Sequence, residues 1–153
     1  MNVAIDTNVL VYAEGVNDRP RRDAAHALLR ALPPESTLIP VQALGELYTT
    51  LVKKAHRPRE VAAEAVLSWG DAFPLIESSN DILLAALDLA RVRDLSLWDA
   101  LMMSAAADAH CRLLLSEDLQ DGFTWRGVTV ANPFATPRNP LLAAIAGKSG
   151  LQS

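Results

Sequence analysis

Met1-Asn2-Val3-Ala4-Ile5-Asp6-Thr7-Asn8-Val9-Leu10 is the stretch that decides the fold of this chain. Its apolar run stops at an acid and two small polar residues, and the chain then becomes apolar again. A short aliphatic run closed by polar residues is typical of a buried strand, and Asp at such a turn commonly caps the following helix. We therefore expect a strand over Asn2–Asp6 and a helix directly after it. Because ligands of α/β proteins lie beyond the carboxyl ends of strands, Asp6 is also placed where a site would lie.

The alternation of short apolar runs with amphipathic segments continues along the chain. Further strands are predicted at Thr37–Pro40, Pro74–Glu77, Arg112–Ser116 and Val128–Ala131. Helices are predicted at Asp23–Leu32, Val41–Ala55, Pro58–Ala72, Asn80–Arg93 and Leu97–His110, with Arg19–Arg22 as a basic loop before the first of them. Such a pattern predicts an α/β fold of three layers, α/β/α, with a mainly parallel sheet of four to five strands flanked by helices.

The two parts of the chain differ in character. Residues 1–134 carry the alternating pattern and are expected to form one domain. Residues 135–153 contain prolines and glycines and are expected to form a tail, in which Leu141–Ala146 makes a short helix that packs on the domain or on a neighbour. With 153 residues the chain is long enough to bury a core without disulfides.

Composition bounds the location and the partners. The single cysteine, Cys111, cannot form an internal disulfide, which favours a reducing cytoplasm. No basic segment precedes a long apolar run, so we expect neither a signal peptide nor a membrane span. The net charge of −4, from 18 acids against 14 Lys and Arg, argues against binding nucleic acid by bulk charge. Without four suspect acids the charges balance at 14 against 14.

Those four acids are Asp6, Glu46, Asp99 and Asp118, and each has an ordinary structural explanation. Asp6 would serve as a helix cap. Glu46 lies on the polar side of its predicted helix, where a solvated acid is normal. Asp118 follows an apolar strand in an acid-rich turn before glycine, a common arrangement without function. Two acid-tipped neighbouring strands would nevertheless place the tips roughly 5 Å apart.

Asp99 is the most informative of the four. Its segment, Leu97–His110, is apolar nearly all round, so a charge inside it needs a reason. One reason is helix capping, because Ser96-Leu97-Trp98-Asp99 has the spacing of a capping box with Asp in place of the usual Glu. Capping and metal ligation are compatible, since a carboxylate has two oxygens.

A cluster of four carboxylates is unfavourable without a cation, since like charges about 4 Å apart repel by roughly 4 kcal/mol per pair at an effective dielectric constant near 20. Oxygen ligands without paired His or Cys indicate Mg²⁺ or Mn²⁺. Such a centre is suited to phosphodiester hydrolysis. The three histidines, His26, His56 and His110, show no metal-binding spacing.

With these residues in place, the chain resembles the PIN-domain proteins, and more narrowly the VapC-type toxins of prokaryotic toxin–antitoxin pairs. The resemblance covers about residues 1–134, and its markers in chain order are Ile5-Asp6-Thr7-Asn8-Val9-Leu10, Leu44-Gly45-Glu46-Leu47, Leu97-Trp98-Asp99-Ala100, Leu115-Ser116-Glu117-Asp118-Leu119-Gln120-Asp121-Gly122 and Val130-Ala131-Asn132-Pro133-Phe134. None of these is specific alone, whereas their order and spacing are.

The resemblance implies a metal-dependent endoribonuclease. Carboxylates matching Asp6, Glu46, Asp99 and Asp118 would bind one or two Mg²⁺ or Mn²⁺ ions, and cleavage would leave 5′-phosphate and 3′-hydroxyl ends. Four neighbours are expected to hold these ligands in place: Thr7, Asn8, Ser116 and Asp121. The resemblance also implies an RNA substrate, a small VapB-like antitoxin and a homodimer.

One departure from the family pattern concerns the fourth acid. Many relatives carry an aromatic residue close behind it, whereas Phe123 lies five residues after Asp118. Asp118 and Asp121 therefore both stay open as the nearer ligand. Two basic segments, Arg19–Arg22 and Lys53–Arg59, would either grip phosphates or lie as solvated helix ends.

Three other functions are weighed against the ribonuclease. A ribonuclease H-like or DNA-directed nuclease would also use four acids, although the former needs hairpin strands after the first acid. A haloacid dehalogenase-type phosphatase would carry a second Asp at position 8, where this chain has Asn8. A non-catalytic PIN-like binding module would keep the acids as caps only.

Overall fold

The computed structural model describes residues 1–150, including the side chains of residues 1–147. Its strands in chain order are β1 (Asn2–Ile5), β2 (Thr37–Pro40), β3 (Leu75–Ile76), β4 (Cys111–Leu115), β5 (Thr124–Trp125) and β6 (Val128–Ala131). Its helices are α1 (Thr7–Ala13), α2 (Arg19–Ala31), α3 (Val41–Lys53), α4 (Arg59–Ala72), α5 (Asn80–Arg93), α6 (Leu97–Asp108) and α7 (Pro140–Gly150), and a 3₁₀ turn spans Pro34–Ser36.

The strands form one mainly parallel sheet in the order β3-β2-β1-β4-β6-β5. β1 is an inner strand that pairs in parallel with β2 on one side and β4 on the other. Both of its neighbours carry fully buried aliphatic residues, as expected of a parallel sheet covered on both faces. The predicted α/β/α architecture is confirmed.

The sheet has six strands where the sequence predicts four to five. The additional strand is β5, which pairs antiparallel with β6 through Trp125 and Val128. The two residues between them, Arg126 and Gly127, have φ angles of 46° and 82°. A two-residue hairpin turn with both φ values positive matches the twist of the strands. Two residues are too few to show a strand pattern in the sequence.

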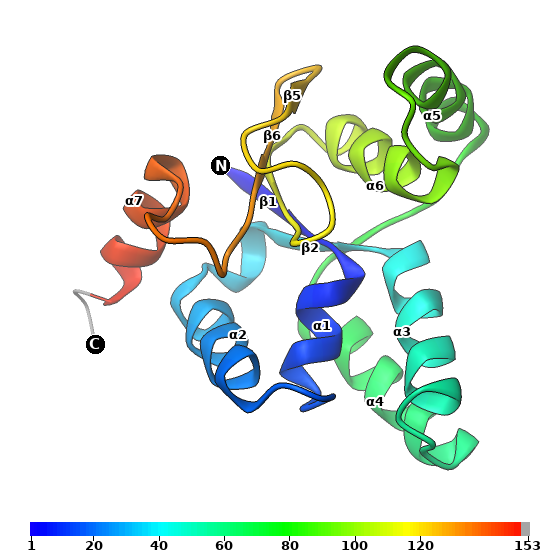
Figure 1. The fold of residues 1–153 in the computed structure, drawn as a ribbon, viewed down its shortest axis with the longest axis vertical. Coiled ribbons are helices and arrows are strands. Elements are labelled where there is room, and N and C mark those ends of the chain that lie inside the picture. The colour runs from blue at the N-terminus through cyan, green and yellow to red at the C-terminus, as the bar shows by residue number, and fades with distance from the viewer. Residues whose placement is uncertain (151–153) are drawn as a thin grey trace.

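The helices form two groups beside the sheet (Figure 1). α6 packs on β2, β4 and β6, and α5 packs on α6. On the other side α1 contacts α2 and α3, and α3 contacts α4. β1 leads directly into α1. The edge of the sheet at which the strands end therefore lies between the two groups of helices.

The basic segment predicted as a loop is instead the first turn of α2. Asp18 caps this helix by accepting a hydrogen bond from the Arg21 backbone N–H at 3.0 Å, and Pro20 lies in its first turn. Both are favoured at helix starts. The helix predicted from Asp23 therefore begins at Arg19.

The C-terminal segment packs on the domain. α7 contacts α2, and Leu142 of α7 is fully buried. The short helix predicted for Leu141–Ala146 thus exists, in a longer form, and it covers part of the core. The last three residues of the predicted tail, 151–153, lie outside the described residues. In residues 1–150, no helix is long and apolar enough to cross a membrane.

Candidate functional site

The site begins where β1 and β4 end side by side. Ile5 pairs with Leu115 in the sheet, and the Asp6 backbone N–H donates to the Leu115 carbonyl at 3.0 Å. The residues that follow these strands, Asp6 and Ser116, are therefore brought together from opposite parts of the chain. The Ser116 hydroxyl donates to Oδ2 of Asp6 at 2.7 Å.

Asp6 is almost fully buried, with 4% of its surface exposed. Its other carboxylate oxygen, Oδ1, accepts the Thr7 backbone N–H at 2.7 Å, so the predicted helix cap is present. Burial raises the pKa of Asp6 to about 6; the hydrogen bonds from Ser116 and Thr7 oppose this rise, and the charges of Asp118 and Glu46 add to it. A buried carboxylate of this kind is destabilised as an anion unless a cation approaches it.

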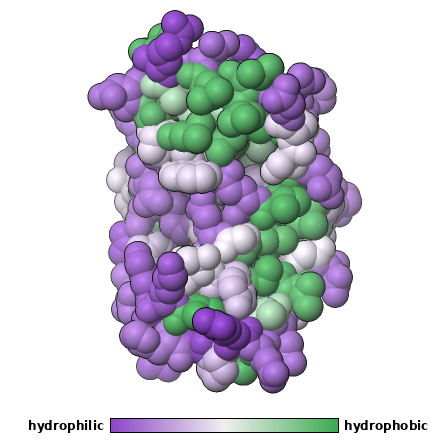
Figure 2. Space-filling model, turned by 90° about the vertical axis from the view of Figure 1, so that its right-hand side faces the viewer, coloured by the Kyte–Doolittle hydropathy of each residue, from purple (hydrophilic) through white to green (hydrophobic). Residues whose placement is uncertain are grey.

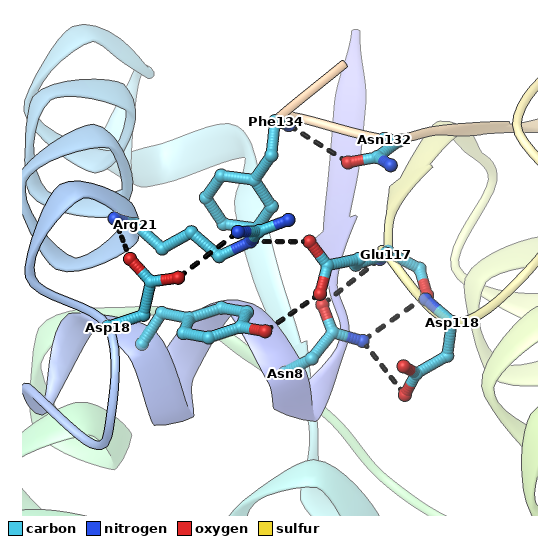
Figure 3. A network of polar contacts seen from close by, with 9 residues as sticks. Asn8, Asp18, Arg21, Glu117, Asp118, Asn132 and Phe134 are labelled. Atoms are coloured by element: carbon cyan, nitrogen blue, oxygen red, sulfur yellow. Dashed lines mark hydrogen bonds and ion pairs between the residues drawn. The ribbon is translucent and has the colours of Figure 1, made fainter.

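Asn8 connects α1 to the loop after β4. Its Oδ1 accepts the Glu117 backbone N–H at 3.1 Å, which fixes the orientation of the amide. Its Nδ2 then donates to Oδ2 of Asp118 at 3.2 Å and to Oδ2 of Asp6 at 3.3 Å. Figure 3 shows the Asn8 amide pointing toward the Asp118 carboxylate and the backbone of Glu117. Asn8 thus holds two of the predicted ligands.

Glu46 is placed by residues of two helices. The Thr7 hydroxyl of α1 donates to Oε2 of Glu46 at 2.8 Å, and Gln42, one turn earlier on α3, donates to Oε1 at 2.9 Å. The sequence pattern alone makes Glu46 a surface acid. The packing of α1 against α3 turns its carboxylate toward Asp6.

Asp99 lies in the first turn of α6. Its backbone N–H donates to the Ser96 hydroxyl at 3.1 Å, which confirms the predicted cap. Burial raises the pKa of Asp99; a hydrogen bond with the Ser96 side chain opposes this rise, and the charges of Asp118 and Glu46 add to it. The cap uses the backbone of Asp99, and the Asp99 carboxylate also interacts with the Ser96 side chain.

The four predicted carboxylates therefore influence one another at one edge of the sheet, since Asp118 and Glu46 act on both Asp6 and Asp99. The ion pairs formed by the described residues involve none of the four. In the described part of the chain, no three acidic, His or Cys side chains are grouped closely enough to hold a metal ion. The all-oxygen donor set suits Mg²⁺ or Mn²⁺.

A cleft of about 1070 Å³ opens in front of these acids. The carboxylates of Glu46 and Asp118 line one end of the cleft, together with Trp98. The cleft continues between α1 and α3 as far as Lys54. Asp6 lies behind Thr7 and Asn8, which also line the cleft.

Asp121 takes a different position from the one considered in the sequence. Its Oδ1 accepts the Asn132 backbone N–H at 2.9 Å, which ties the loop to the chain after β6. Asp118, by contrast, bonds to Asn8 and lines the cleft. The geometry therefore supports Asp118 over Asp121 as the fourth acid.

Sequence reasoning missed a cluster directly behind Asp118. Glu117 accepts hydrogen bonds from the Arg21 Nε at 2.6 Å and from the Tyr12 hydroxyl at 2.7 Å. The Arg21 guanidinium lies 5.5 Å from the ring centre of Tyr12 and 5.4 Å from that of Phe134. We call Arg21, Tyr12 and Phe134 the clamp around Glu117. Figure 3 shows Arg21 beside Phe134 and pointing toward Glu117. No local pattern could have indicated the cluster, because its members come from four separate segments.

The two basic segments are largely committed to structure. Arg21 pairs with Glu117 and Asp18, and Arg57 pairs with Glu14 at 2.6 Å. Lys54 lines the far end of the cleft. Among the side chains that the structure describes, Lys54 is the only one from these two segments that lines the cleft.

The fold and the acids agree with a sequence comparison. The profile of the PIN domain matches residues 3–121. The chain belongs to the PIN-domain family. Its profile match includes all four predicted carboxylates, and its sheet and helices are those of the fold. None of the curated proteins matches the chain significantly.

Solved structures with a similar fold include several VapC toxins. A toxin–antitoxin complex from Klebsiella pneumoniae is 26% identical, with a TM-score of 0.62, over 87% of this chain and 98% of that one. VapC20 of Mycobacterium tuberculosis, a sarcin-ricin-loop-cleaving toxin, is 17% identical with a TM-score of 0.66, over 76% of this chain and 90% of that one. VapBC2 of Rickettsia felis, bound to promoter DNA, is 16% identical with a TM-score of 0.63, over 85% and 97%.

Proposed function

We propose that this PIN-domain protein is a Mg²⁺- or Mn²⁺-dependent endoribonuclease and the toxin of a VapBC-type pair. The observation that carries the proposal is the hydrogen-bonded arrangement at the end of β1, in which Thr7, Asn8 and Ser116 hold the carboxylates of Asp6, Glu46 and Asp118. Asp99 is near enough for the charges of Asp118 and Glu46 to raise its pKa. The similarity to VapC toxins, one of which is described as cleaving RNA, supports this choice of substrate. Cytoplasmic location remains a prediction from composition.

The four carboxylates would hold the ion, and the surrounding side chains prepare them for it. Ser116 and the Thr7 backbone fix both oxygens of Asp6. The Thr7 hydroxyl and Asn8 orient Glu46 and Asp118. When bound, the ion would supply an activated water and neutralise charge on the phosphodiester. The chain's own part is to present ionised oxygens and to line the cleft for RNA.

Cleavage of mixed RNA with Mn²⁺ or Mg²⁺ tests the proposal, with Asp99→Asn as the critical variant. The cap of α6 survives this change, because it uses the backbone N–H of Asp99. Loss of a ligand is expected to lower cleavage by more than about 100-fold, since changes to residues behind metal ligands already cost 10–100-fold. The matched control is Asp108→Asn, at the exposed end of the same helix, which should cleave as wild type does.

Three outcomes would contradict the proposal: cleavage that persists in EDTA, cleavage by Asp99→Asn at the wild-type rate, and absence of cleavage by the wild type. The last outcome favours the non-catalytic binding module. A parallel reaction with single- and double-stranded DNA tests the DNA-directed alternative. A ribonuclease H-like fold is disfavoured, because β2 is the only strand that the structure places between Asp6 and Glu46.

A small antitoxin is the partner we propose, because the Klebsiella and Rickettsia structures are toxin–antitoxin complexes. Its segment would cover the cleft and present Arg to the carboxylates. Co-expression with the adjoining small reading frame, followed by affinity purification, tests this. The absence of a co-purified small protein would count against it.

Self-association is proposed through α5. Leu83, Leu84 and Leu87 are 38%, 53% and 46% exposed on this helix. Figure 2 shows hydrophobic side chains gathered at the top of the view, where α5 lies. Burial of such a patch stabilises association. Sedimentation velocity is expected to give a dimer for wild type and a monomer for Leu84→Glu.

A further inference from the structure

We propose that Trp98 forms a stacking subsite for an unpaired RNA base beside the scissile phosphodiester. The proposal deepens the proposed ribonuclease function and rests on it for the identity of the substrate. Trp98 is 61% exposed, which is unusual for so large an apolar ring. A broad indole face left in water is available for a ligand to cover.

The other two tryptophans already have partners. The Trp69 indole N–H donates to Glu14 at 2.8 Å, and the Trp125 ring lies 4.6 Å beneath the Arg126 guanidinium. The ring–ring and cation–ring contacts formed by the described side chains do not include Trp98. Its exposure therefore sets it apart from the other two tryptophans, which are half-buried.

The position of Trp98 links it to the acids. It lines the same cleft as Glu46 and Asp118, and it directly precedes Asp99 in the first turn of α6. The Ser96 cap holds that turn in place. A base stacked on the ring would thus place its own sugar-phosphate backbone next to the carboxylates.

The rest of the cleft suits a single strand. Gln42, Thr49 and Thr50 line it along α3, and Lys54 lines its far end. At 1.5 Å per residue, Gln42 and Lys54 lie about 18 Å apart along the helix, a length of several nucleotides. An aromatic face at the acid end and a cation at the other match a base and a phosphate of one strand. The base must be unpaired, because a duplex keeps its base faces stacked internally.

Binding in the absence of divalent ions tests the subsite without cleavage. The probe is a fluorescein-labelled single-stranded RNA of about eight nucleotides, and affinity is measured by anisotropy in EDTA. Trp98→Ala is expected to weaken binding about 10- to 100-fold, while Trp98→Phe keeps most of the affinity. Trp125→Ala is the matched control and should bind as wild type does. Thermal melting checks that each variant is folded.

A spectroscopic readout locates the contact. In a Trp69→Phe/Trp125→Phe protein, Trp98 is the sole fluorophore of its kind, and RNA is expected to quench its emission. A double-stranded RNA of the same sequence should quench little. The same full-length proteins are also sedimented without RNA, so that a role of Trp98 in self-association is detected.

Equal RNA affinity of Trp98→Ala and wild type, or no quenching of Trp98, would overturn the subsite. A lower dimer fraction with unchanged RNA affinity would identify Trp98 as a protein contact and would also refute it. The two proposals fail separately. Metal-dependent cleavage without stacking refutes the subsite alone, whereas quenching by RNA without any cleavage refutes the ribonuclease alone.

Discussion

Glu117 and Asp118 are neighbours in the chain, yet their carboxylates lie in opposite surroundings. Glu117 accepts from the cationic Arg21 and from the Tyr12 hydroxyl. Asp118 accepts from the neutral amide of Asn8, and its charge disfavours ionisation of Asp6 and Asp99. The loop after β4 therefore separates a neutralised acid from a group of mutually repelling ones. Acids without a cationic partner among the described residues therefore lie on one face of this loop. An external cation would relieve the repulsion between them.

The largest expected effect is the response of the metal-free protein to pH. Burial raises the pKa of Asp6 from 3.8 to about 6. Between these pH values the folded protein keeps a proton that the unfolded chain has lost, so stability is highest below about pH 4 with respect to this group and falls as the pH rises to 6. The full difference is roughly 3 kcal/mol.

Urea unfolding in EDTA across this range measures the effect. Asp6→Asn should reduce the slope of the curve, because it removes one of the two groups, Asp6 and Asp99, whose pKa is raised. A wild-type protein whose stability stays constant or increases from pH 4 to pH 6 would show that Asp6 is not disfavoured as an anion.

Addition of a metal ion should offset, at neutral pH, the loss of stability caused by ionisation of buried Asp6. Mn²⁺ that binds only the folded state is expected to stabilise it by about 2.7 kcal/mol at a concentration of 100 times Kd. Thermal melting with and without millimolar Mn²⁺ measures this for wild type and Asp99→Asn. Equal melting shifts in the two proteins would place the ion elsewhere.

Neutralising the two neighbouring acids should have opposite effects on the metal-free protein. Asp118→Asn removes repulsion and is expected to raise the melting temperature by about 2–4 °C. Glu117→Gln leaves Arg21 without its carboxylate and should lower it by a similar amount. A shift of the melting temperature in the same direction for both variants would show that Glu117 and Asp118 do not lie in opposite electrostatic surroundings.

The smallest effect is expected from Tyr12→Phe. It removes one hydrogen bond to Glu117 but keeps the ring beside Arg21 and Phe134. We expect a loss of about 2 °C in melting temperature and an unchanged Mn²⁺ shift. A changed Mn²⁺ shift would mean that the clamp also governs ion binding.

The parts of the molecule that follow from local chemistry were predictable from the sequence. β1 and β4 are continuous aliphatic runs, and Asp6 and Ser96 cap helices as their spacing predicts. The capping signal of Asp18 and Pro20 was also present, although the basic residues on both sides of Pro20 favoured a loop. Local patterns thus indicate elements well when no competing pattern overlies them.

The parts that depend on distant contacts were not predictable. Glu46 resembles a surface acid until α3 meets Thr7, which lies 39 residues earlier. The partner of Glu117 lies 96 residues away on α2, and no periodicity connects the two. The residue pattern and the family resemblance together indicated the four acids and the supporting role of Asn8, whereas the clamp and the exposed position of Trp98 required the packed structure.

The pairing of β1 with β4 also has a consequence during synthesis. Asp6 leaves the ribosome early, but the hydroxyl that holds it belongs to Ser116, 110 residues later. At about 5–20 residues per second, roughly 5–20 s pass before the two can meet. A nascent chain that stops before β4 therefore carries Asp6, Glu46 and Asp99 but cannot assemble the site. The sheet order therefore delays assembly of the site until the polypeptide is nearly complete.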